Sequence, residues 1–191
     1  LGTGLRHAQR IAHCGADRLA VVYATMRKPE ELYTLAWDGS DERRHTRLNR
    51  GWVSRRAQPH VSKRRFRVPA GDGRIEHVDA WLLRPDGDGP FPLLVDLHGG
   101  PHSHVLVDYP AHVYQYALLG KGWMVLAPNA VGTSGYGREF RERLRGRWGE
   151  LDLPQILAMV QALQHEGLAD QRIACAGKSY GGFLSAWAVG H

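Results

Sequence analysis

The sequence has no long hydrophobic run and little cysteine. Its longest apolar runs, such as 91–95, have the length of a strand, whereas a membrane helix needs about 18 uninterrupted apolar residues. We therefore expect no contact with a membrane. The two cysteines, Cys14 and Cys175, stand far apart in the chain, which argues against a disulfide framework and favours a reducing compartment. This predicts a cytoplasmic protein, although no targeting signal can be looked for in a chain that begins at Leu1.

The composition is that of a folded globular chain. Of the 191 residues, 43% are hydrophobic and 23% are charged, so a buried core is expected rather than disorder. The net charge of +6 raises the question of a nucleic-acid partner. However, the basic residues are scattered, and those of the stretch 138–147 alternate with Glu139 and Glu142. We interpret them as solvated faces and expect no nucleic acid.

The first third of the chain predicts β structure. Segments 19–25 and 31–37 are predicted as two antiparallel strands, interrupted by 26–30 and ended by the turn Asp38-Gly39. Two short strands are not stable alone, and little sequence precedes them to supply a neighbour, so we expect the end of a larger β structure. A polar, irregular connection is predicted over 51–62. A second β pair is predicted at 64–68 and 75–83.

After Pro90 the pattern changes to alternating strands and helices. Buried strands are predicted at 91–97, 123–127 and 172–176. Helices are predicted at 110–119, 138–144, from Asp152 to just before Gly167, and at 181–189; the third has an apolar stripe formed by Ile156, Leu157, Val160 and Leu163. Strands that alternate with helices predict an α/β fold with a parallel sheet.

The segment 177–181 has the form G-x-S-x-G and lies between a predicted strand and a predicted helix. In a nucleophile elbow the serine stands on a strained turn, and the two flanking glycines let strand and helix pass closely. The helix behind the serine directs backbone N–H groups at the developing oxyanion. Ser179 is therefore the predicted nucleophile, and Gly182 is expected to allow still closer helix packing. The alternative is a glycine-rich packing turn with an ordinary surface serine.

A second loop belongs to the same edge of the predicted sheet. His98-Gly99-Gly100-Pro101 follows the strand 91–97, and its glycine amides can complete an oxyanion hole. We predict donors from the N–H of Tyr180 and from that of Gly99 or Gly100.

The neighbouring loops match neither a metal site nor a nucleotide-binding loop. The residues His98, His102 and His104 lack the spacing of a helical metal pair, and only Asp108 accompanies them, so no metal is expected. The segment 132–137 matches neither G-x-G-x-x-G nor a P-loop, so we expect no cofactor there but a loop at the rim of the site.

Several motifs in a fixed order resemble the prolyl oligopeptidase family of serine peptidases. They are His98-Gly99-Gly100-Pro101, Pro128-Asn129 leading to 132–137, Arg147-Trp148-Gly149 with Asp152, Asp170 with Arg172, and Ser179-Tyr180-Gly181-Gly182-Phe183. Segment 19–48 resembles the last propeller blade of that family, and 63–85 resembles the hairpin that opens its hydrolase domain. The resemblance implies a C-terminal remnant of a β-propeller at 1–62. It implies the N-terminal part of an α/β-hydrolase domain at 63–191.

The function implied is that of a serine peptidase that hydrolyses oligopeptides through an acyl-enzyme on Ser179, without a cofactor. Acylaminoacyl-peptidases and dipeptidyl-peptidases belong to this family, and the resemblance leaves a homo-oligomer open. The side chains of His98 and Tyr180 are expected to contact the peptide substrate. His98 stands where some relatives carry a Tyr, which points to an oxyanion hole made of backbone amides; Val131 stands where many carry an Arg. A carboxylesterase and an inactive hydrolase scaffold are the alternatives.

The catalytic acid and base are not evident in this chain. In α/β-hydrolases the acid and then the histidine follow the serine, but only 12 residues follow Ser179. His191 stands at the far end of the predicted helix, about 18 Å away at 1.5 Å per residue. We therefore expect the hydrolase fold to be truncated after the nucleophile helix, with the Asp and His of the triad beyond residue 191. We also expect the 191-residue chain alone to be inactive.

Overall fold

The computed structural model describes residues 5–105, 107–108 and 113–191. The chain divides into two compact units, one of residues 1–58 with 106–116 and one of residues 59–105 with 117–191. No helix of the described residues is long and apolar enough to cross a membrane. The assignment of residues 1–62 to a β-propeller and of residues 63–191 to an α/β-hydrolase domain stays a prediction.

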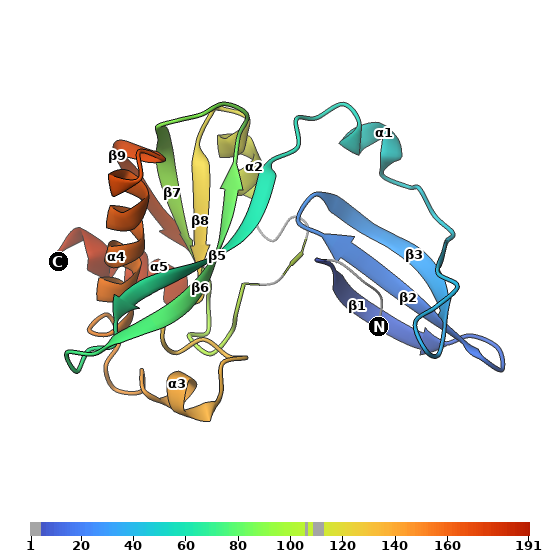
Figure 1. Cartoon of the computed structure of the whole chain (residues 1–191), viewed down its shortest axis with the longest axis horizontal. Helices are drawn as coiled ribbons and strands as arrows, with labels where there is room; N and C mark the ends of the chain where they lie inside the picture. Colours follow the sequence, from blue (N-terminus) through green and yellow to red (C-terminus); the bar gives the residue numbers. More distant parts are fainter. Residues whose placement is uncertain (1–4, 106, 109–112) are drawn as a thin grey trace. The chain divides into compact units, whose positions relative to one another are not determined.

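The first unit contains a four-stranded sheet in the order β1-β2-β3-β4 (Figure 1). The strands are β1 (His7–His13), β2 (Arg18–Thr25), β3 (Lys28–Ala36) and β4 (Arg43–Arg44). The antiparallel pairing of β2 with β3 confirms the predicted pair, although the interruption between them is only two residues long. Its small core consists of Leu19, Val21, Tyr23 and Leu35.

The expectation that no neighbour precedes this pair was wrong. β1 pairs with β2 in antiparallel register, from His7 opposite Ala24 to His13 opposite Leu19. Its sequence, HAQRIAH, is mostly polar and no residue of the strand is buried, so no apolar pattern marked it. Backbone hydrogen bonds to β2 hold it instead.

The connection between the two units is more ordered than predicted. A short helix, α1 (Arg50–Val53), interrupts the predicted irregular segment, and β5 (His60–Pro69) begins before that segment was expected to end. β5 pairs in antiparallel register with β6 (Ile75–Arg84), which confirms the second predicted β pair and extends it at both ends. The turn between these strands is closed by a hydrogen bond from the Ala70 N–H to the Arg74 carbonyl oxygen.

The second unit contains a five-stranded sheet in the order β5-β6-β8-β7-β9. β7 (Phe91–Leu97) lies between β8 (Met124–Pro128) and β9 (Ala169–Gly177) and runs parallel to both, which confirms the predicted α/β arrangement. Among the described residues, three helices lie wholly in this unit: α3 (Arg138–Glu142), α4 (Asp152–His165) and α5 (Tyr180–Val189). The division between the units falls within α2 (Val113–Leu119), after Tyr116. The expected start of α2 at Pro110 lies outside the described residues. α4 packs against β5 and β9, and α5 packs against β7 and β9 (Figure 1).

Two expectations about burial were wrong in this unit. β7 and β8 are fully buried, as predicted, but β9 is not, and Ile173 is 40% exposed. The reason is that β9 lies at the edge of the described sheet and pairs only with β7. In α4 the buried stripe contains Met159 instead of Leu157, which is 45% exposed because it points about 100° away from Ile156 around the helix.

Candidate active site

The parallel strands bring the two predicted site loops together. Leu97, the last residue of β7, lies opposite Gly177, the last residue of β9. The turn 98–101 and the turn at Ser179 therefore leave the sheet side by side at its carboxyl edge, where open α/β sheets hold their ligands.

Ser179 has the strained geometry of a nucleophile elbow. Its backbone has φ 58° and ψ −120°, a conformation that costs a non-glycine residue about 1–3 kcal/mol. The glycines on either side of Ser179 are needed because β9 and α5 pass close to the end of β7. A Cβ at Gly177 would lie 2.5 Å from the Leu97 carbonyl oxygen, and one at Gly181 would lie 2.0 Å from it. Gly182 does not share this requirement, because its closest contact would be an ordinary 3.4 Å to the Gly177 carbonyl oxygen.

The turn 98–101 packs directly against this elbow. A Cβ at Gly99 would lie 3.1 Å from the Lys178 carbonyl oxygen and 3.5 Å from the Cβ of Ser179. The backbone N–H groups of Gly99, Gly100 and Tyr180 donate to no other residue in the described part of the chain. An unpaired N–H next to a nucleophile is what an oxyanion hole requires. Which of the three donors bind an oxyanion stays a prediction.

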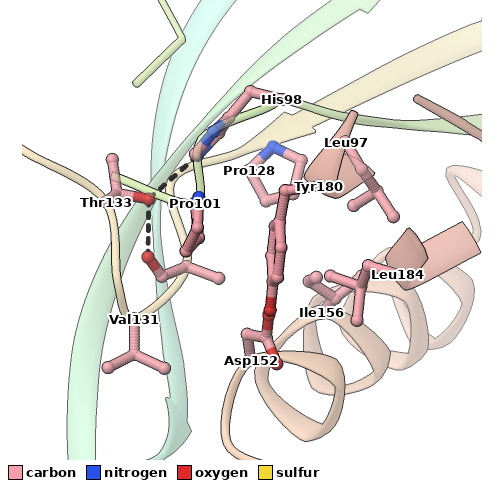
Figure 2. A pocket seen from close by; sticks show the side chains of 11 residues that line it. Leu97, His98, Pro101, Pro128, Val131, Thr133, Asp152, Ile156, Tyr180 and Leu184 are labelled. Carbon is pink, nitrogen blue, oxygen red and sulfur yellow. Dashed lines mark hydrogen bonds between the residues drawn. The ribbon is translucent and has the colours of Figure 1, made fainter. Parts of the chain in front are cut away.

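The imidazole of His98 ties this turn to the loop that follows β8. Its Nδ1–H donates to the Gly99 carbonyl oxygen at 2.8 Å. Its Nε2 lies 3.0 Å from the Thr133 hydroxyl (Figure 2). Burial lowers the pKa of His98, so the ring is neutral at pH 7. Nδ1 is thus engaged within the protein, and Nε2 faces the Thr133 hydroxyl, which itself donates to the Ala130 carbonyl oxygen at 2.6 Å. The predicted contact of His98 with substrate stays a prediction.

Further hydrogen bonds join the same pair of loops. The His102 Nδ1–H donates to the Gly132 carbonyl oxygen at 2.9 Å, and the Ser134 N–H donates to the Ser103 carbonyl oxygen at 2.9 Å. Segment 132–137 therefore supports the turn beside Ser179. Among the described residues, no three His, Cys, Asp or Glu side chains are grouped so that they could hold a metal ion.

Sequence reasoning missed the role of Gln155. This fully buried side chain of α4 accepts a hydrogen bond from the Val131 N–H at 2.8 Å. Its amide nitrogen donates to the Pro69 carbonyl oxygen at 3.0 Å and to Glu76 at 2.6 Å. Gln155 thus holds the loop after β8 at Val131, the position where the sequence lacks the arginine of many relatives. The sequence contained one sign of this role, because Gln155 is a polar residue next to Ile156 in the apolar stripe of the predicted helix.

Sequence reasoning also missed a buried pair behind the elbow. The Tyr180 hydroxyl donates to Asp152 Oδ2 at 2.6 Å (Figure 2). The other oxygen, Oδ1, accepts from the N–H groups of Gly149 at 2.9 Å and Leu153 at 3.1 Å. Burial raises the pKa of Asp152. Burial, together with the Asp152 carboxyl, also raises the pKa of Tyr180. The pair borders a cavity of about 20 Å³, large enough for one water molecule.

The described residues place no base beside Ser179. The Ser179 side chain is exposed and its hydroxyl makes no hydrogen bond to another described residue. His191 is occupied elsewhere: its ring stacks on Trp187 with 4.0 Å between centroids, and its Nδ1–H donates to the Trp187 carbonyl oxygen.

Comparison with known sequences gives a consistent set of relatives. Residues 111–191 match the model of a family described as the prolyl oligopeptidase family. The chain is 33% identical over 168 residues to the uncharacterized peptidase YuxL of Bacillus subtilis, and 27% identical over 166 residues to dipeptidyl-peptidase 5 of Porphyromonas gingivalis. Each alignment covers 85% of this chain but 24% of the relative. The chain thus spans about a quarter of the length of these relatives.

Solved structures agree with this result. The chain is similar to the acylaminoacyl peptidase of Pyrococcus horikoshii, with a TM-score of 0.79 and 28% identity over 98% of this chain and 29% of that one. It is also similar to a puromycin hydrolase, with a TM-score of 0.72 and 30% identity over 95% of this chain and 28% of that one.

Proposed function

We propose that the full-length protein is a serine peptidase of the prolyl oligopeptidase family, whose model matches residues 111–191, with Ser179 as its nucleophile. The observation that carries the proposal is the strained backbone of Ser179, with the glycine turn 98–101 packed against it. The relatives include a dipeptidyl-peptidase and an acylaminoacyl peptidase, so the proposed substrates are oligopeptides that lose a short or acylated N-terminal unit.

In the proposed reaction the Ser179 hydroxyl attacks the carbonyl carbon of the scissile peptide bond. The tetrahedral oxyanion accepts hydrogen bonds from the N–H of Tyr180 and from that of Gly99 or Gly100. Collapse of this intermediate expels the amine and leaves an ester on Ser179, which water then hydrolyses. A histidine must take the serine proton, and since the Ser179 hydroxyl has no partner among the described residues, we propose that this histidine and its carboxylate partner follow residue 191.

Labelling of the full-length protein with a fluorophosphonate probe tests this assignment. We expect the wild type to be labelled and to hydrolyse peptide p-nitroanilides, and Ser179→Ala to lose both properties. Ser185→Ala is the matched control, because Ser185 lies in the same helix and its hydroxyl donates to the Gly181 carbonyl oxygen at 2.7 Å. Equal labelling of wild type and Ser179→Ala would show that Ser179 is not the nucleophile.

The choice of substrate separates a peptidase from an esterase. Hydrolysis of p-nitrophenyl esters without hydrolysis of p-nitroanilides would replace the peptidase proposal with that of a carboxylesterase. The 191-residue chain alone is expected to hydrolyse neither class above the buffer rate, since an unactivated serine is a weak nucleophile.

A further inference from the structure

We infer that Asp152 is a positioning residue for the oxyanion hole: it holds the phenol of Tyr180 and thereby the backbone N–H that Tyr180 presents beside Ser179. This inference rests on the proposed function, because it concerns the stabilisation of the oxyanion formed at Ser179. The proposed donor is the backbone of Tyr180, and the question is what keeps that backbone in place.

The side chain of Tyr180 is fixed along its whole length. It is 7% exposed, and its ring packs against Trp148 and Phe183 with centroid distances of 5.1 and 5.6 Å. At its far end the hydroxyl donates to Asp152 at 2.6 Å. In the described part of the chain, this is the only side-chain hydrogen bond that joins α4 to α5. A displacement of Tyr180 therefore has to break it.

Asp152 is itself rigidly held. It is 2% exposed and is the first residue of α4, so the helix backbone fixes its Cα. Its Oδ1 is occupied by the N–H groups of Gly149 and Leu153. This leaves Oδ2 directed at Tyr180 (Figure 2). Gly149, whose φ is +79°, packs closely on Trp187 of α5, since a Cβ there would lie 2.4 Å from the indole nitrogen. The carboxylate is thus anchored to both helices.

The physical need for such an anchor comes from the strain at Ser179. A residue with φ 58° tends to relax to an ordinary backbone conformation unless its surroundings oppose this. Relaxation at Ser179 would rotate the peptide unit that it shares with Tyr180, and with it the N–H donor. An oxyanion donor has to lie about 2.7–3.1 Å from the oxygen that it stabilises. The hydrogen bond between Tyr180 and Asp152 therefore preserves the distance between the Tyr180 N–H and the oxyanion oxygen, which matters mainly in the transition state.

Two conservative variants of the full-length enzyme test the inference. Tyr180→Phe removes the hydroxyl and keeps the ring, and Asp152→Asn keeps the shape and removes the charge. We expect each to lower kcat about tenfold with KM within about twofold, because a small misplacement of catalytic groups is costly in the transition state. The double variant should be no worse than the more damaged single variant, since both changes break one interaction. Affinity for a peptide boronic acid, which forms a tetrahedral adduct, should fall in proportion to kcat.

A purely structural role predicts a different result. Val160→Ala is the control, because it removes buried methyl groups about two turns further along the same helix. It should lower the melting temperature and leave kcat and boronate affinity unchanged below that temperature. If Tyr180→Phe behaves like Val160→Ala in an enzyme with Ser179-dependent turnover, the positioning role is refuted and the proposed function stands. If the wild type shows no Ser179-dependent labelling or turnover, both are overturned. Should Asp152→Asn fail to fold, Tyr180→Phe decides alone.

Discussion

Replacement of Gly181 by alanine tests whether the close approach of α5 to β7 shapes the active site. The new Cβ would lie 2.0 Å from the Leu97 carbonyl oxygen, 2.8 Å from its carbonyl carbon and 3.1 Å from the His98 carbonyl oxygen. All three are backbone atoms at the end of a buried strand, so no side chain can rotate away. A gap of about 1.4 Å has to open before the nearest contact becomes an ordinary one.

Two opposing energies decide the result of Gly181→Ala. Alanine is favoured over glycine in a helix interior by about 1 kcal/mol. Overpacking against a rigid neighbour costs about 1–3 kcal/mol, and here the clash involves backbone and lies at the severe end of that range. We therefore expect a net loss of about 2 kcal/mol in the free energy of unfolding. The displaced residues lead into the turn 98–101, so kcat should also fall, by about 100-fold for a shift of about 1 Å.

The adjacent glycine provides the control for this prediction. A Cβ at Gly182 would meet only the Gly177 carbonyl oxygen at 3.4 Å, so Gly182→Ala should range from neutral to about 1 kcal/mol more stable. Urea denaturation followed by circular dichroism, together with kcat for a peptide p-nitroanilide, measures both effects in the full-length protein. Equal stability and equal kcat for the two alanine variants would refute the argument from close approach.

The remaining predictions concern the turn beside Ser179 and the first unit. Gly99→Pro should lower kcat at least 100-fold by removing a donor, whereas His98→Ala should cost less, because the proposed donor is the backbone; steady-state kinetics decides, and equal losses would assign the role to the side chain. Because burial lowers the pKa of His98, the ¹⁵N shifts of its imidazole should report a neutral ring at pH 7. The contribution of His98 to the free energy of unfolding should be present above the unfolded pKa of about 6.5 and lost as pH falls through the lower folded pKa. In the first unit, burial alone would raise the pKa of Glu31, but hydrogen bonds from Thr46, from Arg44 and from two backbone N–H groups lower it overall. The stabilisation of the fold by Glu31 should therefore be complete above pH 4.5 and lost as pH falls through the folded pKa. Glu31→Gln should lower the free energy of unfolding at pH 7 by about 1–3 kcal/mol. In urea denaturation, this variant should also lack that part of the pH dependence.

The elements predicted from sequence are those whose cause lies in consecutive residues. The apolar runs 91–97 and 123–127 predicted buried strands, and β7 and β8 are fully buried. The elbow was also predictable, because the need for glycine at 177 and 181 is a steric consequence of a strand that turns sharply into a helix. Resemblance of several motifs to the prolyl oligopeptidase family then led to the proposal of a serine peptidase.

The elements that sequence analysis missed depend on a partner distant in the chain. β1 is polar and is a strand because β2 lies beside it, not because of its own pattern. The exposure of β9 follows from its place at the sheet edge, which strand order decides and composition does not. The same holds for Gln155, whose hydrogen-bond partners belong to three other segments of the chain.

The order of residues alone predicted the alternation of strands and helices, the position of the proposed nucleophile and the glycine turn near it. Only the tertiary structure decided that Gly99 packs against Ser179 and that Asp152, 28 residues from Tyr180, holds its hydroxyl. These features differ in how far apart in the chain the interacting residues stand. Hydrophobic periodicity and the sterics of glycine act between neighbours in the chain. A buried hydrogen bond forms between whichever donor and acceptor the packed strands and helices bring within about 3 Å.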